Sequence, residues 1–122
     1  MKIEIKTINT VSVAVIYHDT PLITDVQSAL DVIMTVKYQT NCTNIAINKE
    51  AFADAFFTLS TCLAGEILQK FINYGIKLAI YGDFSKYTSK PLKDFMYESN
   101  KGNDIFFQPD CEQAINKLSM GK

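Results

Sequence analysis

A regular alternation of short apolar segments with longer amphipathic ones constrains the fold more than any other feature of this sequence. In the longer segments, large apolar residues recur three and four positions apart, which is the spacing of one helix face. The short segments are rich in β-branched residues, as is typical of strands, and they lie at residues 2–7, 11–17, 44–47, 76–81 and 105–107. The predicted order along the chain is therefore β-β-α-β-α-β-α-β-α.

This order predicts an α/β fold built on one sheet. Strands that alternate with helices join through right-handed crossovers and lie parallel. A hairpin turn is expected at Asn9-Thr10, and it makes the first strand antiparallel to the second. We therefore expect a single-layer, mixed, mostly parallel five-stranded sheet with helices. A chain of 122 residues can bury one core, so residues 1–122 should form a single α/β domain.

Capping signals give the expected bounds of the first two helices. Residues 24–27 have the spacing of a capping box, and the helix that they open should run to about residue 36. The second helix is expected to begin at Ser60, because its apolar residues have helical spacing from there on. The segment before it, residues 48–59, fits either a helical turn or an apolar loop.

The last two helices are expected to follow the N-terminal caps Ser89 and Asp110. Gly121 stands just past the end of the final helix, where glycine is common. Another glycine, Gly65, lies within the second helix, where it costs about 1 kcal/mol relative to alanine. We interpret Gly65 as a sign that another backbone or a partner approaches this helix closely.

All strongly basic residues are lysines, since the chain has no arginine. Arginine is the residue of choice for bidentate binding of phosphates and for reading guanine, so its absence argues against sequence-specific nucleic-acid binding. The base composition of an AT-rich genome, which favours lysine, asparagine and isoleucine, is the simpler explanation of the missing arginine. The 12 lysines nearly balance the 13 acidic residues. Residues 70–101 nevertheless hold six lysines and three acidic residues, whereas residues 1–69 hold four lysines and seven acidic residues. This asymmetry is compatible with a protein partner or with a homo-oligomer.

The three cysteines, Cys42, Cys62 and Cys111, lie far apart in the sequence. Their odd number and wide spacing fit neither a disulfide framework nor a zinc site. We therefore expect no metal site and a reducing, cytoplasmic setting. The sequence also lacks a phosphate-cradling glycine pattern, and we expect no cofactor. No apolar run is long enough to cross a membrane, and the first residues lack the apolar region of a signal peptide. We interpret Cys62 as a buried core residue.

The parallel strands predict where a site would lie. Ligands of such sheets bind beyond the carboxyl ends of the strands, and the four loops that begin there form what we call the rim. These loops bring His18 and Asp19, residues 48–61, residues 83–90 and Gln108. Any functional side chains of this chain are expected among them.

Ser60 and Thr61 are the first candidates on the rim, as phosphoacceptors or as contacts for an anion. Both stand at a predicted helix N-terminus, where free amides and the positive end of the dipole favour negative charge. A simpler interpretation is that Ser60 only caps the helix. The next loop adds binding candidates of mixed aromatic and charged character, and these are Asp83, Ser85, Lys86 and Tyr87.

A different kind of site would use the only histidine, His18. It could act as a general base with Asp19 or Asp83 beside it. A small-ligand binder or an enzyme is therefore the alternative function. A histidine at a strand end is more often a hydrogen-bonded loop residue, and the chain offers no complete catalytic set.

Several longer motifs carry a resemblance to a known family. They are LAGEILQKF at 63–71, KLAI at 77–80, GDFSKY at 82–87, KDF at 93–95 and YESNKG at 97–102. Over about residues 25–107 the chain resembles the bacterial family called domain of unknown function 4180. The resemblance implies membership of that family, but it implies no activity and no catalytic residues.

The order of elements is also similar to that of STAS domains, the fold of anti-sigma-factor antagonists. In those proteins a serine or threonine at the start of the helix after the third strand is phosphorylated by a partner kinase, which controls binding. Ser60 and Thr61 occupy the equivalent position here, although the usual Asp-Ser-Ser-Gly motif is absent. Together these features predict a non-enzymatic, STAS-like regulatory or protein-interaction module with its binding surface near Ser60.

Overall fold

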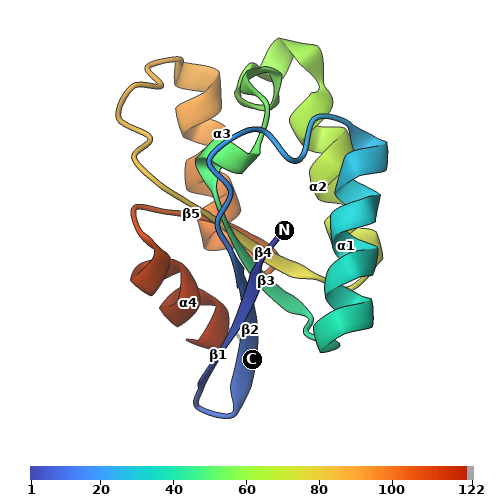
Figure 1. Cartoon of the computed structure of the whole chain (residues 1–122). Coiled ribbons are helices and arrows are strands. Elements are labelled where there is room, and N and C mark those ends of the chain that lie inside the picture. Colours follow the sequence, from blue (N-terminus) through green and yellow to red (C-terminus); the bar gives the residue numbers. More distant parts are fainter. Residues whose placement is uncertain (121–122) are drawn as a thin grey trace.

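One sheet organises the fold, and its strands follow one another in space as they do in sequence. The structure is a computed structural model and describes residues 1–120 of the chain (Figure 1). The sheet has five strands in the order β1-β2-β3-β4-β5. Their bounds are Ile3–Ile8 for β1, Val11–Ile16 for β2, Asn44–Asn48 for β3, Lys77–Tyr81 for β4 and Ile105–Gln108 for β5.

The strand directions are those expected from the sequence. β1 pairs antiparallel with β2, and β2, β3, β4 and β5 are mutually parallel. Between β1 and β2, Asn9 and Thr10 both have positive φ angles, 52° and 68°. A two-residue turn of this kind matches the right-handed twist of a hairpin. The predicted mixed, mostly parallel five-stranded α/β fold is therefore confirmed.

Three helices cover one face of the sheet and one covers the other (Figure 1). The helices that connect the parallel strands lie on the same face, as right-handed crossovers require. The fourth returns across the opposite face. Their bounds are Val26–Thr40 for α1, Leu63–Asn73 for α2, Lys90–Lys101 for α3 and Cys111–Met120 for α4.

Both faces of the central strands are buried, which explains why their sequences are almost continuously apolar. In β2, Ala14 and Ile16 pack into the larger core under α1, α2 and α3. Val13 and Val15 point the other way and pack with α4. Because successive side chains of the strand point to opposite faces, the strand contributes residues to two separate apolar cores, one on each face of the sheet.

Helix α1 differs from its predicted bounds at both ends. Asp25 is the N-cap, since its carboxylate accepts a hydrogen bond from the Ser28 amide at 2.8 Å, and the Ser28 hydroxyl accepts one from the Asp25 amide at 3.0 Å. The predicted box at residues 24–27 was thus wrong by one position. The helix continues to Thr40, past residue 36, and ends at Asn41 in the left-handed region, with φ 57°.

The segment left unassigned in the sequence forms three short 3-10 helices, at Lys49–Ala51, Asp54–Phe57 and Leu59–Thr61. Helix α2 begins only at Leu63, three residues later than predicted, because Ser60 and Thr61 belong to the last of these turns. Gly121, expected just past the final helix, lies outside the described residues.

The structure contradicts the interpretation of Cys62, and it contradicts the backbone contact, though not the partner contact, that was expected at Gly65. Cys62 is exposed rather than buried, and with φ 63° it forms the junction between the last 3-10 turn and α2. Gly65 is also exposed, and a Cβ built on it would meet nothing within 4 Å. No close approach of a backbone therefore explains the glycine at position 65.

Candidate functional site

The rim lies where β2, β3, β4 and β5 end, and in Figure 1 its loops run from the top of the view to the left side, where the chain passes from β5 to α4. Because these strands are parallel, the loops that leave their carboxyl ends meet at one edge of the sheet. The loops contain residues 17–25, 49–62, 82–89 and 109–110. The rim loops expected from the sequence are therefore adjacent in the structure, but Asn48 and Gln108, which were expected in these loops, are the last residues of β3 and β5.

A buried asparagine joins the first two of these loops. Asn48 ends β3 and is 1% exposed. Its side-chain oxygen accepts a hydrogen bond from the His18 amide, and its nitrogen donates to the His18 carbonyl, both at 2.8 Å. The nitrogen also lies 3.1 Å from Glu50 Oε1. Asn48 thus fixes the backbone after β2 against the end of β3, and it satisfies polar groups that burial would otherwise leave unpaired.

The imidazole of His18 is engaged locally. Its Nδ1 lies 2.7 Å from the Thr20 carbonyl oxygen, two residues further along the same loop. Asp19, the second member of the alternative polar site, is exposed. The contacts of His18 are therefore those of a hydrogen-bonded loop residue, and its main chain makes the bonds that hold the rim together.

Lys49 follows Asn48 and is nearly buried, with 9% of its surface exposed. Its Nζ lies 3.3 Å from Glu50 Oε2 and 5.6 Å from the ring centroid of Tyr87. Burial raises the pKa of Glu50, but hydrogen bonds from Asn48 and Lys49 and the charge of Lys49 outweigh it, so the pKa is lowered overall. The negative charge of the Glu50 carboxylate thus balances the positive charge of the nearly buried Lys49.

An aromatic cluster holds the loop after β4 in place. Tyr87 stacks on Phe57 with ring centroids 4.9 Å apart and an angle of 24° between planes. Phe84 packs edge-on against Phe107 of β5 at 5.8 Å. Lys86 Nζ lies 5.2 Å from the Tyr87 ring centroid, within the range of a cation–π contact. Of the predicted site residues, Tyr87 therefore packs against Phe57, and its ring is in contact with the charged ammonium group of Lys86.

Asp83 and Ser85 form the tip of the same loop, and both are exposed. The carboxylate of Asp83 accepts a hydrogen bond from the Ser85 amide at 2.9 Å. Hydrogen bonds from Ser85 hold the pKa of Asp83 below its ordinary value. This is the geometry of an Asx turn, in which the side chain replaces a backbone acceptor.

Ser60 and Thr61 are adjacent in sequence but differ in their contacts. The Thr61 hydroxyl lies 2.8 Å from the carbonyl oxygens of Ala55 and Thr58, and it accepts a bond from the Leu63 amide at 3.2 Å. Thr61 therefore closes the last 3-10 turn. The Ser60 side chain is exposed and has no hydrogen-bond partner within the part of the chain that the structure describes.

Ser60 lines a groove of about 270 Å³ between the 3-10 segment and the start of α3. Across it lies Ser89, whose hydroxyl caps α3 by accepting a bond from the Leu92 amide at 3.5 Å. The remaining lining combines apolar side chains with one hydroxyl, from Phe57, Thr58, Leu59 and Pro91. The structure thus places Ser60 in a groove, and it places His18, Asp19 and Asp83 outside the lining of that groove.

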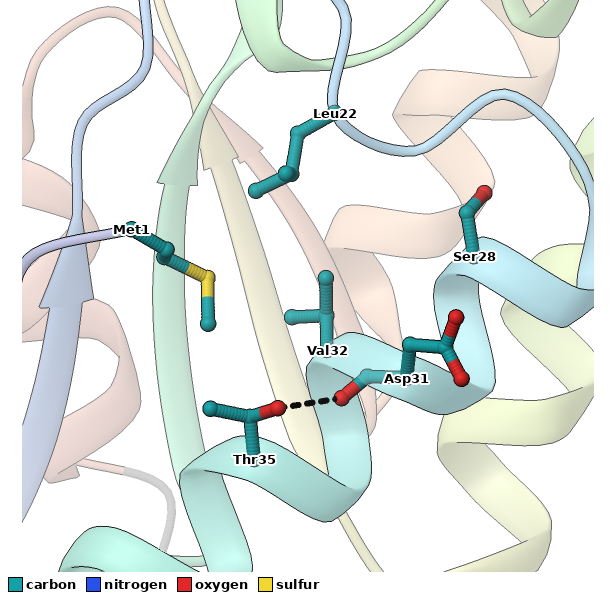
Figure 2. Close-up of a pocket in the computed structure, with 6 residues that line it drawn as sticks. All are labelled: Met1, Leu22, Ser28, Asp31, Val32 and Thr35. Atoms are coloured by element: carbon teal, nitrogen blue, oxygen red, sulfur yellow. Dashed lines mark hydrogen bonds between the residues drawn. The ribbon is translucent and has the colours of Figure 1, made fainter.

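Figure 2 shows a second groove, of about 190 Å³, between Met1 and helix α1. The side chain of Met1 points across it toward Val32, and the Thr35 hydroxyl donates to the Asp31 carbonyl at 2.7 Å beside it. None of the site residues expected from the sequence lines this groove.

Asn48 and Lys49, the buried polar residues of the rim, were not among the site residues expected from the sequence. A polar pair directly after the apolar run at residues 45–47 was the available signal. A second signal was Gly82, which follows β4 at the same edge. In residues 1–120, no group of three or more histidine, cysteine or acidic side chains is placed to hold a metal ion.

Comparison with known families now gives one clear result. The sequence profile of the family described as Domain of unknown function (DUF4180) matches residues 8–118. The chain belongs to this family. The resemblance expected from the motifs is thereby confirmed, and the family's description assigns no activity. No curated protein and no solved structure gives a match to this member of DUF4180, so its similarity to STAS domains stays a prediction.

Among the described residues, no helix is both long enough and apolar enough to cross a bilayer.

Proposed function

We propose that this chain is a non-enzymatic regulatory module that binds a protein partner at the groove beside Ser60. The proposal includes a cytoplasmic location, and it involves no cofactor and no sequence-specific nucleic acid. The observation that carries it is the exposed hydroxyl of Ser60, which has no hydrogen-bond partner among residues 1–120 and stands on the wall of a groove.

The groove has the composition of a site for a protein side chain. Phe57, Leu59 and Pro91 provide apolar walls, and Ser60 and Ser89 provide hydroxyls at opposite sides. Recognition sites combine an apolar lining with a few placed polar groups in this way. The walls are firmly supported, because Phe57 is 5% exposed and stacks on Tyr87. A partner would therefore meet a preformed surface.

Ser60 also suits control by phosphorylation better than Thr61 does. A phosphate on Ser60 would add nearly two negative charges at neutral pH, on a hydroxyl that holds no other part of the structure. The same modification on Thr61 would break the bonds to Ala55 and Thr58 that close the 3-10 turn. The strongly basic residues of the chain are all lysines, so an anion on the rim would be held by hydroxyls and lysines, without a guanidinium.

The test is affinity capture from the native host with matched variants. Wild type, Ser60→Ala, Ser60→Asp and Thr61→Asp are compared, and Gln39→Glu adds a charge on the exposed end of α1 as a control. We expect Ser60→Asp to change recovery of a partner at least about tenfold, while Gln39→Glu leaves it unchanged. Equal recovery with every variant would refute the switch.

The alternative function, a small-ligand binder or enzyme built on His18, Asp19 and Asp83, has weaker support. The His18 ring already contacts the Thr20 carbonyl, and the Asp83 carboxylate closes a turn with Ser85. Both side chains therefore already make hydrogen-bond contacts within their own loops. A ligand that shifted the NMR signals of His18 and Asp83 together, and left those of Ser60 unmoved, would favour this alternative.

A further inference from the structure

The two edge strands of the sheet, β1 and β5, differ in whether a side chain of the chain itself bonds to their outward main-chain groups. At the β5 edge, Asn100 of α3 accepts a hydrogen bond from the Phe107 amide at 2.7 Å, so a side chain closes that edge. At the other edge, β1 pairs with β2 alone over the described residues. An open edge strand presents a row of free amides and carbonyls that can pair with another strand.

Hairpin geometry identifies which groups of β1 face outward. The turn at Asn9 and Thr10 has two residues, so the flanking Ile8 and Val11 form a hydrogen-bonded pair, and bonded and non-bonded pairs alternate from there. The amides and carbonyls of Ile3, Ile5 and Thr7 then point away from β2. Ile5 is 52% exposed although it lies in the middle of the strand.

We propose that β1 pairs antiparallel with β1 of a second copy of this chain, around a two-fold axis at Ile5. In this register the outward groups of Ile5 meet those of its counterpart, and those of Ile3 meet Thr7. About six main-chain hydrogen bonds would form. The exposed Ile5 side chains of the two copies lie opposite each other and cover one another.

Charge complementarity favours a second copy as the occupant of this edge. With Ile5 on the axis, Glu4 of each copy lies opposite Lys6 of the other. These are non-hydrogen-bonded positions, where facing side chains come closest. Shifting the strands to place Glu4 opposite Glu4 would also set Lys2 opposite Lys6, with repulsion at every charged pair. The charges of β1 are thus self-complementary in the register with Ile5 on the two-fold axis, because each Glu4 then faces a Lys6.

The experiment is sedimentation velocity on the full chain over a range of concentrations. Wild type should show a reversible equilibrium between monomer and dimer. Glu4→Lys creates Lys–Lys pairs and Lys6→Glu creates Glu–Glu pairs, so each single variant should dimerise at least about tenfold more weakly. An equimolar mixture of the two variants should form a heterodimer, and the double variant Glu4→Lys/Lys6→Glu should dimerise like wild type.

A control variant, Glu98→Lys, makes the same change of charge on α3, beside the opposite edge, and should leave dimerisation unchanged. A wild type that stays monomeric at every concentration would overturn the proposal. The edge of β1 would then either pair with a strand of another protein or be hydrated. A dimer that persists in both single variants would overturn it as well, because another surface would then hold the copies together. Neither result bears on the groove beside Ser60.

Discussion

Gly82 lies directly against the stem of Lys49. A Cβ at position 82 would stand 2.8 Å from Lys49 Cγ and 2.9 Å from Cδ, and the φ angle of Gly82 is +150°. The end of β4 therefore leaves room for the one lysine side chain that is nearly buried among the described residues. Gly82, which is far from Lys49 in sequence, thus determines where the side chain of Lys49 can lie.

Gly82→Ala should lower the free energy of unfolding by about 1–3 kcal/mol, because the new methyl group overlaps Lys49 and the backbone angle is unfavourable for alanine. Urea unfolding measures this. Gly65→Ala is the matched control, and it should raise stability by about 0.5–1 kcal/mol, since its site is open and helical. Shortening Lys49 to alanine in the Gly82→Ala background should remove the steric part of the loss. Equal effects of the two glycine substitutions would contradict this account.

Asn48→Ala should lower the free energy of unfolding by about 2–3 kcal/mol, because it leaves the amide and carbonyl of His18 without their partner. The control is Asn73→Ala at the exposed end of α2, with an expected effect within about 0.5 kcal/mol. Chemical denaturation of both variants gives the comparison. A loss at position 48 no larger than at position 73 would show that Asn48 does not hold the rim.

Thr61→Ala should lower stability by about 1 kcal/mol, because the hydroxyl closes the 3-10 turn and accepts from the Leu63 amide. Ser60→Ala should be neutral to within about 0.5 kcal/mol, as expected for an exposed side chain without a partner. Thermal unfolding of the two variants side by side separates the roles. The reverse ranking would argue that Ser60 is the structural residue.

The three cysteines should react with a thiol reagent in a definite order. Cys62 is exposed and should be labelled first, whereas Cys42 is buried and should react only when the protein unfolds. Burial raises the pKa of Cys111, so little thiolate forms at neutral pH and labelling should be slow. Mass spectrometry of peptides at successive times gives the order. Early labelling of Cys42 would be inconsistent with the packing of α1 against the sheet.

The sequence predicted the strands, their order and the position of the rim because these depend on local periodicity and on general rules of connection. Helix α3, with Ser89 as its N-cap, was placed correctly for the same reason, since Pro91 and the serine cap are local signals. Errors occurred where contacts distant in sequence decide the local structure.

Residues 49–61 illustrate those errors. Phe56 and Phe57 are buried, and Phe57 stacks on Tyr87, which is thirty residues further along the chain. This packing bends the segment into short 3-10 turns, and no helical period reveals it. Lys49 was overlooked as well, because a lysine in a loop is expected to be exposed, and its cover comes from Gly82 and Tyr87.

Site-specific photo-crosslinking in the native host tests most directly whether a protein partner binds the groove beside Ser60. p-Benzoylphenylalanine is placed at position 60 or 91 on the groove and, as a control, at position 39 on α1. We expect a discrete heavier adduct from positions 60 and 91 that is absent from position 39. No adduct at either groove position, or the same adducts from all three positions, would contradict the claim.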